Sequence, residues 1–230
     1  MNTPAPVQQE MTSAWSMYRA IVGIGALCAL LIVTVYQTTA ARIAENQARF
    51  LALAVSEVLP AAQSTLAIDL NEDGRLVEAT EAPTLPVFLG YDANAELVGA
   101  VVTAQGMGYQ DNIRVLYAYS FELDAIVGFK VLDSKETPGL GDKVETEAHF
   151  IANFEELDAT LSSDGESLLH PIVTVKQGEK TEAWQIDGIT GATITSEAIG
   201  KFLNDSANAW VPVLERHAPS ITLREQTEVE

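Results

Sequence analysis

The hydrophobic pattern changes along the chain, and its first part is an apolar stretch near the N-terminus. No residue between Arg19 and Arg42 is charged, and positions 20–36 are almost continuously apolar. At about 1.5 Å rise per residue, the 22 residues between the two arginines form a helix of roughly 33 Å, enough to cross the hydrocarbon layer. The sequence therefore predicts one transmembrane helix over residues 20–41, preceded by a short segment 1–19.

Aromatic residues flank this stretch. Trp15 and Tyr18 precede it and Tyr36 lies near its other end, where amphipathic rings favour the headgroup level. A cleaved signal peptide is the alternative interpretation. The apolar run is longer than the usual signal core, and Thr39-Ala40-Ala41 matches a cleavage site only loosely, which favours the anchor.

A helical pattern continues after the apolar stretch. Apolar residues recur at near-helical spacing up to Pro60, which cannot continue a helix. These positions are Ile43, Phe50, Leu51, Ala54, Val55 and Val58. We therefore predict that the helix leaves the membrane as a stalk over residues 42–60.

Further along, the pattern becomes typical of β-structure. Short runs of β-branched and aromatic residues, separated by turn-forming residues, predict strands at 97–104, 113–121, 126–133, 172–176 and 183–186. Helical periodicity returns at 150–161 and 197–214. Because the strands follow one another without regular intervening helices, the sequence predicts an α+β domain over 61–214, an antiparallel sheet flanked by helices.

Two regions lack such patterns. Between 61 and 96 the sequence gives mainly loop signals, with a turn at 71–74 and breakers at Pro83 and Pro86. The acidic segment 215–230 is predicted to be a disordered tail.

Composition narrows the function classes. The formal charge is −19, and only Glu10 and Arg19 are charged before residue 42, so the whole excess falls on 42–230. Such an acidic domain is a poor partner for nucleic acid. Cys28, the only cysteine, lies within the apolar stretch, so no disulfide, cysteine-ligated iron–sulfur cluster or structural zinc is predicted. The three histidines are too scattered to predict a metal site.

A loop rich in hydroxyls precedes the last predicted helix. Residues 187–196 read Asp-Gly-Ile-Thr-Gly-Ala-Thr-Ile-Thr-Ser. Small residues let a phosphate approach the backbone, and the free N–H groups of a first helical turn attract an anion. The pattern therefore favours a phosphate site. The simpler alternative is that Thr195 or Ser196 only caps the helix.

A second loop, residues 135–143, follows the predicted strand 126–133. It reads Lys-Glu-Thr-Pro-Gly-Leu-Gly-Asp-Lys, and its proline and two glycines force a turn. By itself this is an ordinary connection between a strand and a helix.

Together the two loops resemble the signatures of the FMN-binding domains of Rnf and Na⁺-pumping quinone reductase complexes. In that family a flavin transferase modifies the pattern Asp-x-x-Thr/Ser-Gly-Ala-Thr, whose last Thr carries FMN through a phosphoester. The matching residue is Thr193. The resemblance places the other members of this loop in the cofactor site: Asp187, Thr190, Gly191, Ala192, Thr195 and Ser196.

The 135–143 loop matches the Glu-Thr-Pro-Gly-Leu-Gly signature that lines the isoalloxazine ring in this family. The resemblance implies polar contacts from Glu136 and Thr137, an apolar face from Leu140, and close backbone approach at Gly139 and Gly141.

A weaker match, Gln105–Ile113, resembles a Gly-x-Gly-Tyr segment of Rnf relatives. Tyr109 packing on the core is at least as good an interpretation, and we do not assign it to the flavin. A nearby lysine, with Lys143 or Lys201 as candidates, would favour the negative charge of the reduced ring.

The resemblance implies a membrane-anchored electron carrier with covalent FMN and no independent catalytic site. It is nearer to the G subunits of Rnf complexes, which couple ferredoxin–NAD electron flow to ion movement, than to the C subunits of Na⁺-translocating NADH:quinone reductase. The implied partners are the other membrane subunits and a flavin transferase. Segment 1–19 would be cytoplasmic, and the domain would lie on the periplasmic side of the inner membrane. A non-redox anchored scaffold is the alternative from another class.

Overall fold

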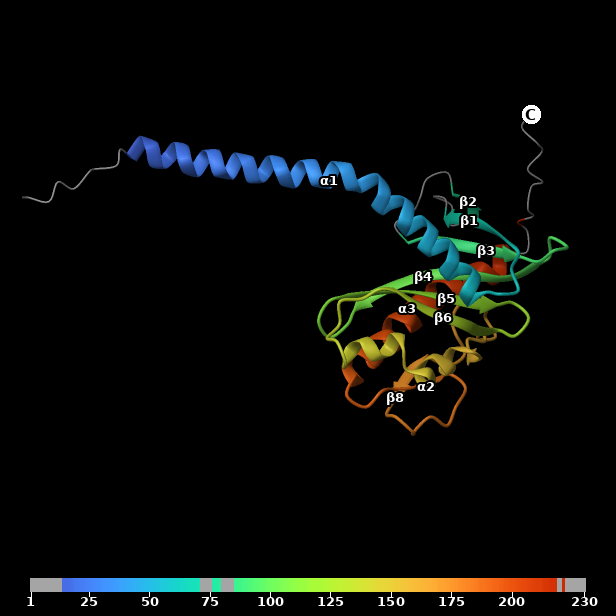
Figure 1. Cartoon of the computed structure of the whole chain (residues 1–230). Helices are drawn as coiled ribbons and strands as arrows, with labels where there is room; N and C mark the ends of the chain where they lie inside the picture. Colours follow the sequence, from blue (N-terminus) through green and yellow to red (C-terminus); the bar gives the residue numbers. More distant parts are fainter. Residues whose placement is uncertain (1–13, 71–75, 80–84, 219–220, 222–230) are drawn as a thin grey trace, which may run out of the picture. The chain divides into compact units, whose positions relative to one another are not determined.

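The computed structural model describes residues 14–70, 76–79, 85–218 and 221. They form two compact units, one up to Phe50 and one from Leu51 onward. A single helix, α1 (Ala14–Val58), begins in the first unit and ends in the second (Figure 1). The segments predicted as membrane helix and stalk therefore form one continuous helix. The predicted turn at 71–74, Pro83, and most of segments 1–19 and 215–230 lie outside the described residues.

In the first unit, α1 is long and apolar enough to cross a membrane, and none of its most apolar window is buried within the protein. Its polar side chains are satisfied locally. The hydroxyls of Thr34, Thr38 and Thr39 each donate to the carbonyl oxygen four residues earlier, at 2.7, 2.9 and 2.8 Å. Such bonds leave none of these three hydroxyls unpaired in hydrocarbon, which suits a membrane span.

The second unit is built on a seven-stranded antiparallel sheet with the strand order β2-β1-β3-β4-β5-β6-β7. The strands are β1 (Ser64–Leu70), β2 (Leu76–Glu78), β3 (Val87–Tyr91), β4 (Leu97–Met107), β5 (Asn112–Ser120), β6 (Ala125–Asp133) and β7 (Leu157–Asp158). A small parallel pair, β8 (Val173–Val175) and β9 (Gln185–Asp187), stands apart from it. The predicted α+β class is confirmed.

The central strands are buried on both faces, which is why their sequences are continuously hydrophobic. Along β4, Ala100 and Val102 face the larger core, while Val101 between them faces a second core. That second core is closed by the last turns of α1, through Ala54, Val55 and other residues. The sheet is therefore the middle of three layers.

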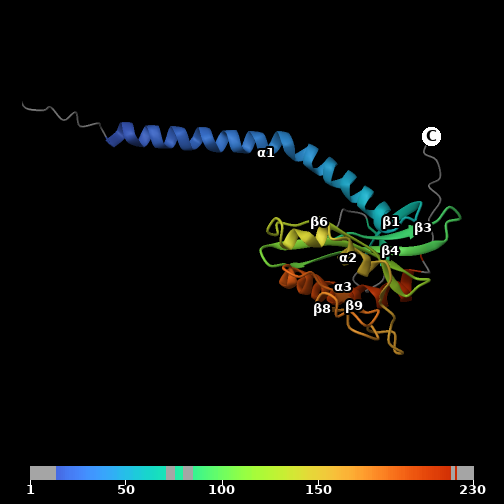
Figure 2. The same ribbon diagram turned by 60° about the horizontal axis from the view of Figure 1, so that its bottom comes forward.

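The other face of the sheet is covered by α3 (Thr193–His217), with β8 and β9 on the same side (Figures 1 and 2). Its buried positions recur every four residues, at Ile199, Leu203, Ala207 and Val211. This stripe packs along β4 and fixes the direction of the helix. The first turn of α3 is thereby held in place at one end of the sheet.

Two parts of the prediction were wrong. The helix predicted at 150–161 is only the short turn α2 (Ala148–Ile151), followed by the 3-10 turn η2 (Ala152–Phe154) and then by β7. Phe150, Phe154 and Leu157 are buried at helix-like spacing, but Leu157 pairs with Ile126 as an edge strand.

The region predicted as mainly loop, residues 61–96, contains β1, β2 and β3. Leu66, Ile68 and Leu70 alternate along β1, a short strand signal that the prediction missed, although of its seven residues only Ile68 is fully buried. Its position in the sheet is set by pairing with β3, from Ser64 opposite Tyr91 to Ile68 opposite Val87.

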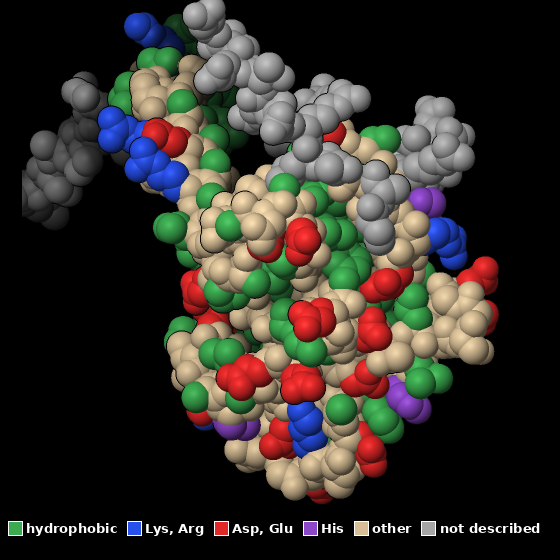
Figure 3. All heavy atoms as spheres, turned by 90° about the vertical axis from the view of Figure 1, so that its right-hand side faces the viewer, with side chains coloured by type: hydrophobic (Ala, Val, Ile, Leu, Met, Phe, Trp, Pro, Cys, Tyr) green, Lys and Arg blue, Asp and Glu red, His purple; other side chains and the backbone are tan. Residues whose placement is uncertain are grey.

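Acidic side chains outnumber basic ones on the face of the domain drawn in Figure 3. Figure 3 shows one face on which Asp and Glu are spread widely, with few Lys or Arg among them. The charge inferred from the sequence is thus carried mostly by solvated surface groups.

Candidate functional site

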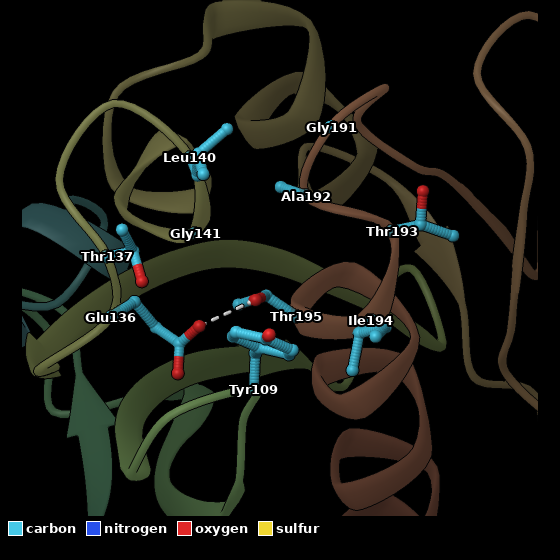
Figure 4. Close-up of a pocket in the computed structure, with 10 residues that line it drawn as sticks. All are labelled: Tyr109, Glu136, Thr137, Leu140, Gly141, Gly191, Ala192, Thr193, Ile194 and Thr195. Atoms are coloured by element: carbon cyan, nitrogen blue, oxygen red, sulfur yellow. Dashed lines mark hydrogen bonds between the residues drawn. The ribbon is translucent and has the colours of Figure 1, made fainter.

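A pocket of about 310 Å³ opens where three loops meet. The loops are the turn between β4 and β5, the 135–143 loop with its short 3-10 helix η1 (Gly141–Glu145), and the start of α3 (Figure 4). The lining residues are Tyr109, Glu136, Thr137, Leu140, Gly141, Gly191, Ala192, Thr193, Ile194 and Thr195. The pocket therefore unites the two loops that the sequence singled out, which lie about fifty residues apart.

Glu136 joins the three loops. Its side chain is 6% exposed, and one carboxylate oxygen accepts a 2.7 Å hydrogen bond from the Thr195 hydroxyl (Figure 4). The other oxygen accepts a 2.9 Å bond from the backbone N–H of Gln110. The Thr137 hydroxyl adds a second link to that turn by donating to the Gln110 side chain at 3.0 Å. Glu136 thus lines the pocket and also binds the two neighbouring loops to its own loop.

Glycines make room for this carboxylate. A Cβ at Gly108 would lie 2.5 Å from one oxygen of Glu136, and a Cβ at Gly141 would lie 2.4 Å from the other. Gly139 and Gly191 are glycines for another reason, since their φ angles of 76° and 89° are unfavourable for other residues. The glycine pattern of the three loops therefore follows from local geometry.

The first turn of α3 has no side-chain cap; its N-cap residue is Ala192. Thr195 donates instead to Glu136, and the Ser196 hydroxyl accepts a 3.2 Å bond from the N–H of Ile189. The alternative in which Thr195 or Ser196 caps the helix is therefore wrong. Because first-turn N–H groups have no partner within the helix, this end of α3 suits an anion.

Thr193 is the first residue of α3, four residues before the predicted start, and it is exposed. Figure 4 shows its side chain on the outer side of the turn, pointing away from the Glu136–Thr195 pair. Its hydroxyl is thus accessible at the rim of the pocket, beside the uncapped helix end.

Four predicted residues do not line the pocket: Gly139, Asp187, Thr190 and Ser196. Asp187 accepts a 2.6 Å bond from the N–H of Gly178, and the N–H of Thr190 donates to Gln177 at 3.0 Å. Ser196 is fully buried beneath the loop. Asp187, Thr190 and Ser196 therefore help to shape the 187–196 loop without lining the pocket.

Conversely, the structure places two unassigned residues in the lining. Tyr109 is 64% exposed and lines the pocket, so its predicted packing on the core is wrong. Ile194, 56% exposed, was missed because a single apolar residue between threonines gave no signal. Neither Lys143 nor Lys201, the candidates for a nearby cation, lies in the lining that the described residues form.

An exposed ion pair holds the turn between β4 and β5. Lys135 donates to Asp111 at 3.1 Å. The N–H of Asn112, and after it Lys135, lower the pKa of the Asp111 carboxyl, and Asp111 raises the pKa of Lys135. Because both groups are in water, the pair contributes little to stability and serves mainly to orient the turn.

Behind the 187–196 loop, the buried amide of Asn153 connects it to η2. Its oxygen accepts from the N–H of Asp187 at 2.9 Å, and its nitrogen donates to the carbonyl of Asp187 at 3.1 Å and to that of Phe150 at 3.0 Å. Lys180 also donates to Asn153, and partial burial lowers the pKa of this lysine.

Replacing this amide should weaken the domain. Asn153→Ala leaves buried backbone groups unpaired, so we expect a loss of about 1–3 kcal/mol of unfolding free energy. Thermal unfolding of the full chain in detergent measures it. Gln177→Ala, which removes an exposed partner of the same loop, is the control and should cost less than about 0.5 kcal/mol. Equal effects of the two changes would contradict the role of Asn153.

The residues present fit FMN. Leu140, Ile194 and the ring of Tyr109 offer apolar contacts to a flat aromatic ring, while hydroxyls and the uncapped end of α3 suit a phosphate. The pocket is open at its mouth, where these three side chains are half or more exposed.

Comparison with known proteins agrees with this chemistry. Residues 108–208 match the FMN-binding domain family. The G subunit of the ion-translocating oxidoreductase complex of Aliivibrio fischeri (strain MJ11) is 31% identical over 188 residues, covering 79% of this chain and 83% of that protein. Its counterpart in Methanosarcina acetivorans is 29% identical over 194 residues, which cover 82% of this chain and 89% of that protein.

A third relative is the G subunit of the Na(+)-translocating ferredoxin:NAD(+) oxidoreductase complex of Acetobacterium woodii. It is 29% identical over 215 residues, which cover 91% of this chain and 98% of that protein. Among solved structures, the C subunit of Na(+)-translocating NADH-quinone reductase from Parabacteroides distasonis has a TM-score of 0.54 at 22% identity. The match spans 66% of this chain and 78% of that one, and shows the same fold. The chain belongs to the family of G subunits of ion-translocating oxidoreductase complexes, with an FMN-binding domain over residues 108–208.

Proposed function

We propose that this protein carries FMN bound covalently to Thr193 through a phosphoester. The observation that carries the proposal is the position of the Thr193 hydroxyl, exposed at the first residue of an uncapped helix and at the rim of an apolar pocket. In the attachment, made by a flavin transferase, the threonine oxygen loses its proton and bonds to the phosphorus of an activated flavin nucleotide, whose own P–O bond breaks.

The residues around Thr193 have distinct roles in this proposal. The first-turn N–H groups of α3 hold the phosphate, and Leu140, Ile194 and Tyr109 contact the ring. Glu136 and Thr195 keep the loops together. FMN itself supplies the ability to accept and release electrons.

A covalent bond would prevent the cofactor from dissociating. The domain carries nearly the whole −19 of the chain, and this field repels a free phosphate-bearing cofactor. The pocket is also open, which weakens non-covalent binding. A tether keeps the cofactor at high effective concentration in its own pocket while leaving the ring accessible to other proteins.

At the level of the complex, the protein acts as an electron carrier of an Rnf-type ion-translocating complex linking ferredoxin and NAD. Support comes from the G subunits among its relatives, one named for ferredoxin:NAD(+) oxidoreductase. The apolar part of α1 anchors the protein in the cytoplasmic membrane as a single span, with the domain on its outer side. Its partners are the other membrane proteins of the complex.

The intact mass of the full chain tests the proposal. Co-expression with an active flavin transferase should add the mass of one FMN less one water, and expression without the transferase should not. The same mass reports whether α1 is retained, which decides between an anchor and a cleaved signal. An unmodified chain in both cultures would support a non-redox scaffold instead.

A further inference from the structure

The lining of the pocket contains one charged side chain among the residues that the structure describes. That side chain is Glu136; the other nine lining residues are apolar, are glycine or carry a hydroxyl. No lysine or arginine of the described chain contributes to the lining, although carboxylates are abundant on the outer surface. Glu136 is therefore the one formally charged side chain of the lining that the described residues form, opposite the partial positive charge of the uncapped α3 end.

The carboxylate is held firmly. Thr195 donates to one oxygen at 2.7 Å and the Gln110 N–H donates to the other at 2.9 Å. Both oxygens therefore have a hydrogen-bond partner within the protein. A side chain at Gly108 or Gly141 would collide with the same oxygens, so these two glycines are needed for the carboxylate to occupy this position. Because the side chain is almost entirely buried, solvent and salt screen its charge weakly.

We propose that Glu136 sets the redox potential of the flavin held in this pocket, an inference that rests on the proposed function. A fixed negative charge in the lining opposes the negative charge that the ring gains on reduction, so it holds the potential low. Thr195 and Gln110 are positioning residues, since they keep the carboxylate at the floor of the pocket rather than in water. The domain thus lowers the potential with one buried group instead of its diffuse surface charge.

The test is the flavin midpoint potential of Glu136→Gln, measured by spectroelectrochemistry on the full chain expressed with its flavin transferase. The amide keeps the local bonds, because its oxygen still accepts from Gln110 and its nitrogen can donate to the Thr195 hydroxyl. We expect a more positive potential, with the equilibrium constant for reduction raised about tenfold, which is about 30 mV for two electrons.

Glu197→Gln is the matched control. It removes the same charge from an exposed residue on the first turns of α3, outside the lining, where water and salt screen it. Its potential should stay near that of the wild type. A Glu136→Gln potential equal to that of Glu197→Gln would overturn the inference.

Covalent attachment of flavin is measured first, as fluorescence of the protein band on a denaturing gel. This separates a failure of the proposed function from a failure of the role of Glu136. A wild-type chain without flavin contradicts the proposed function, whereas flavinylated variants with equal potentials contradict only the role of Glu136. If Glu136→Gln does not yield folded protein, Leu140→Lys is compared with Leu140→Gln, since Leu140 is half exposed and tolerates change. A cation there should raise the potential, and equal potentials in this pair would also overturn the inference.

Discussion

Thr193→Ala should abolish covalent flavin in the full chain co-expressed with its transferase. The substitution removes the only atom that can form the proposed phosphoester and leaves the fold unchanged, because the side chain is exposed and no side-chain cap is lost at the start of α3. Alanine also has the highest helix propensity, so the first turn remains intact. The expected result is complete loss of flavin fluorescence from the protein band on a denaturing gel viewed under ultraviolet light.

Glu197→Gln provides the control for this experiment. Glu197 is exposed on the first turns of α3, but it lies outside the pocket lining and outside the 187–196 loop. Its replacement should therefore leave the fluorescent band at wild-type intensity. A band that persists in Thr193→Ala, or disappears in both variants, would contradict attachment at Thr193.

Phe150→Ala should destabilise the domain by about 3–5 kcal/mol. Phe150 is fully buried, and its ring packs edge-on against Phe129 and Phe154 at centroid distances of 6.2 and 5.4 Å. Truncation leaves a cavity between β6 and η2, and η2 carries the Asn153 amide that supports the 187–196 loop. The effect should therefore reach the pocket as well as the core.

Thermal unfolding of the full chain in detergent measures this loss. For a protein of this size, about 3–5 kcal/mol corresponds to a fall of roughly 6–20 °C in Tm. Phe150→Leu, which keeps most of the volume, is the control and should cost less than about 1.5 kcal/mol. A Phe150→Ala protein that melts within about 3 °C of the wild type would show that the aromatic cluster does not hold this part of the domain.

The parts of the fold that could be predicted are those with an unambiguous hydrophobic pattern. The middles of strands β4 and β5 are buried on both faces and β6 is largely covered, so all three are rich in apolar and β-branched residues. The stripe of α3 and the apolar half of α1 are equally clear. In contrast, the alternation of Leu66, Ile68 and Leu70 in β1 is short, and the strand is mostly exposed and takes its place in the sheet from pairing with β3.

The site was predictable only in part, for a related reason. The 135–143 and 187–196 loops carry recognisable residues, and the structure brings them to one pocket. The hydrogen bond between Glu136 and Thr195 joins residues 59 positions apart, so sequence spacing alone does not reveal it. Tyr109 could equally have packed inward. Its exposure follows from the turn that Glu136 holds through Gln110.

Mass-spectrometric peptide mapping of the natively expressed chain tests the central claim most directly. The peptide that contains Thr193 should carry the mass of FMN less one water, with fragment ions placing the addition on Thr193 and not on Thr190 or Thr195. An unmodified peptide from cells whose flavin transferase labels a second acceptor protein would contradict the account.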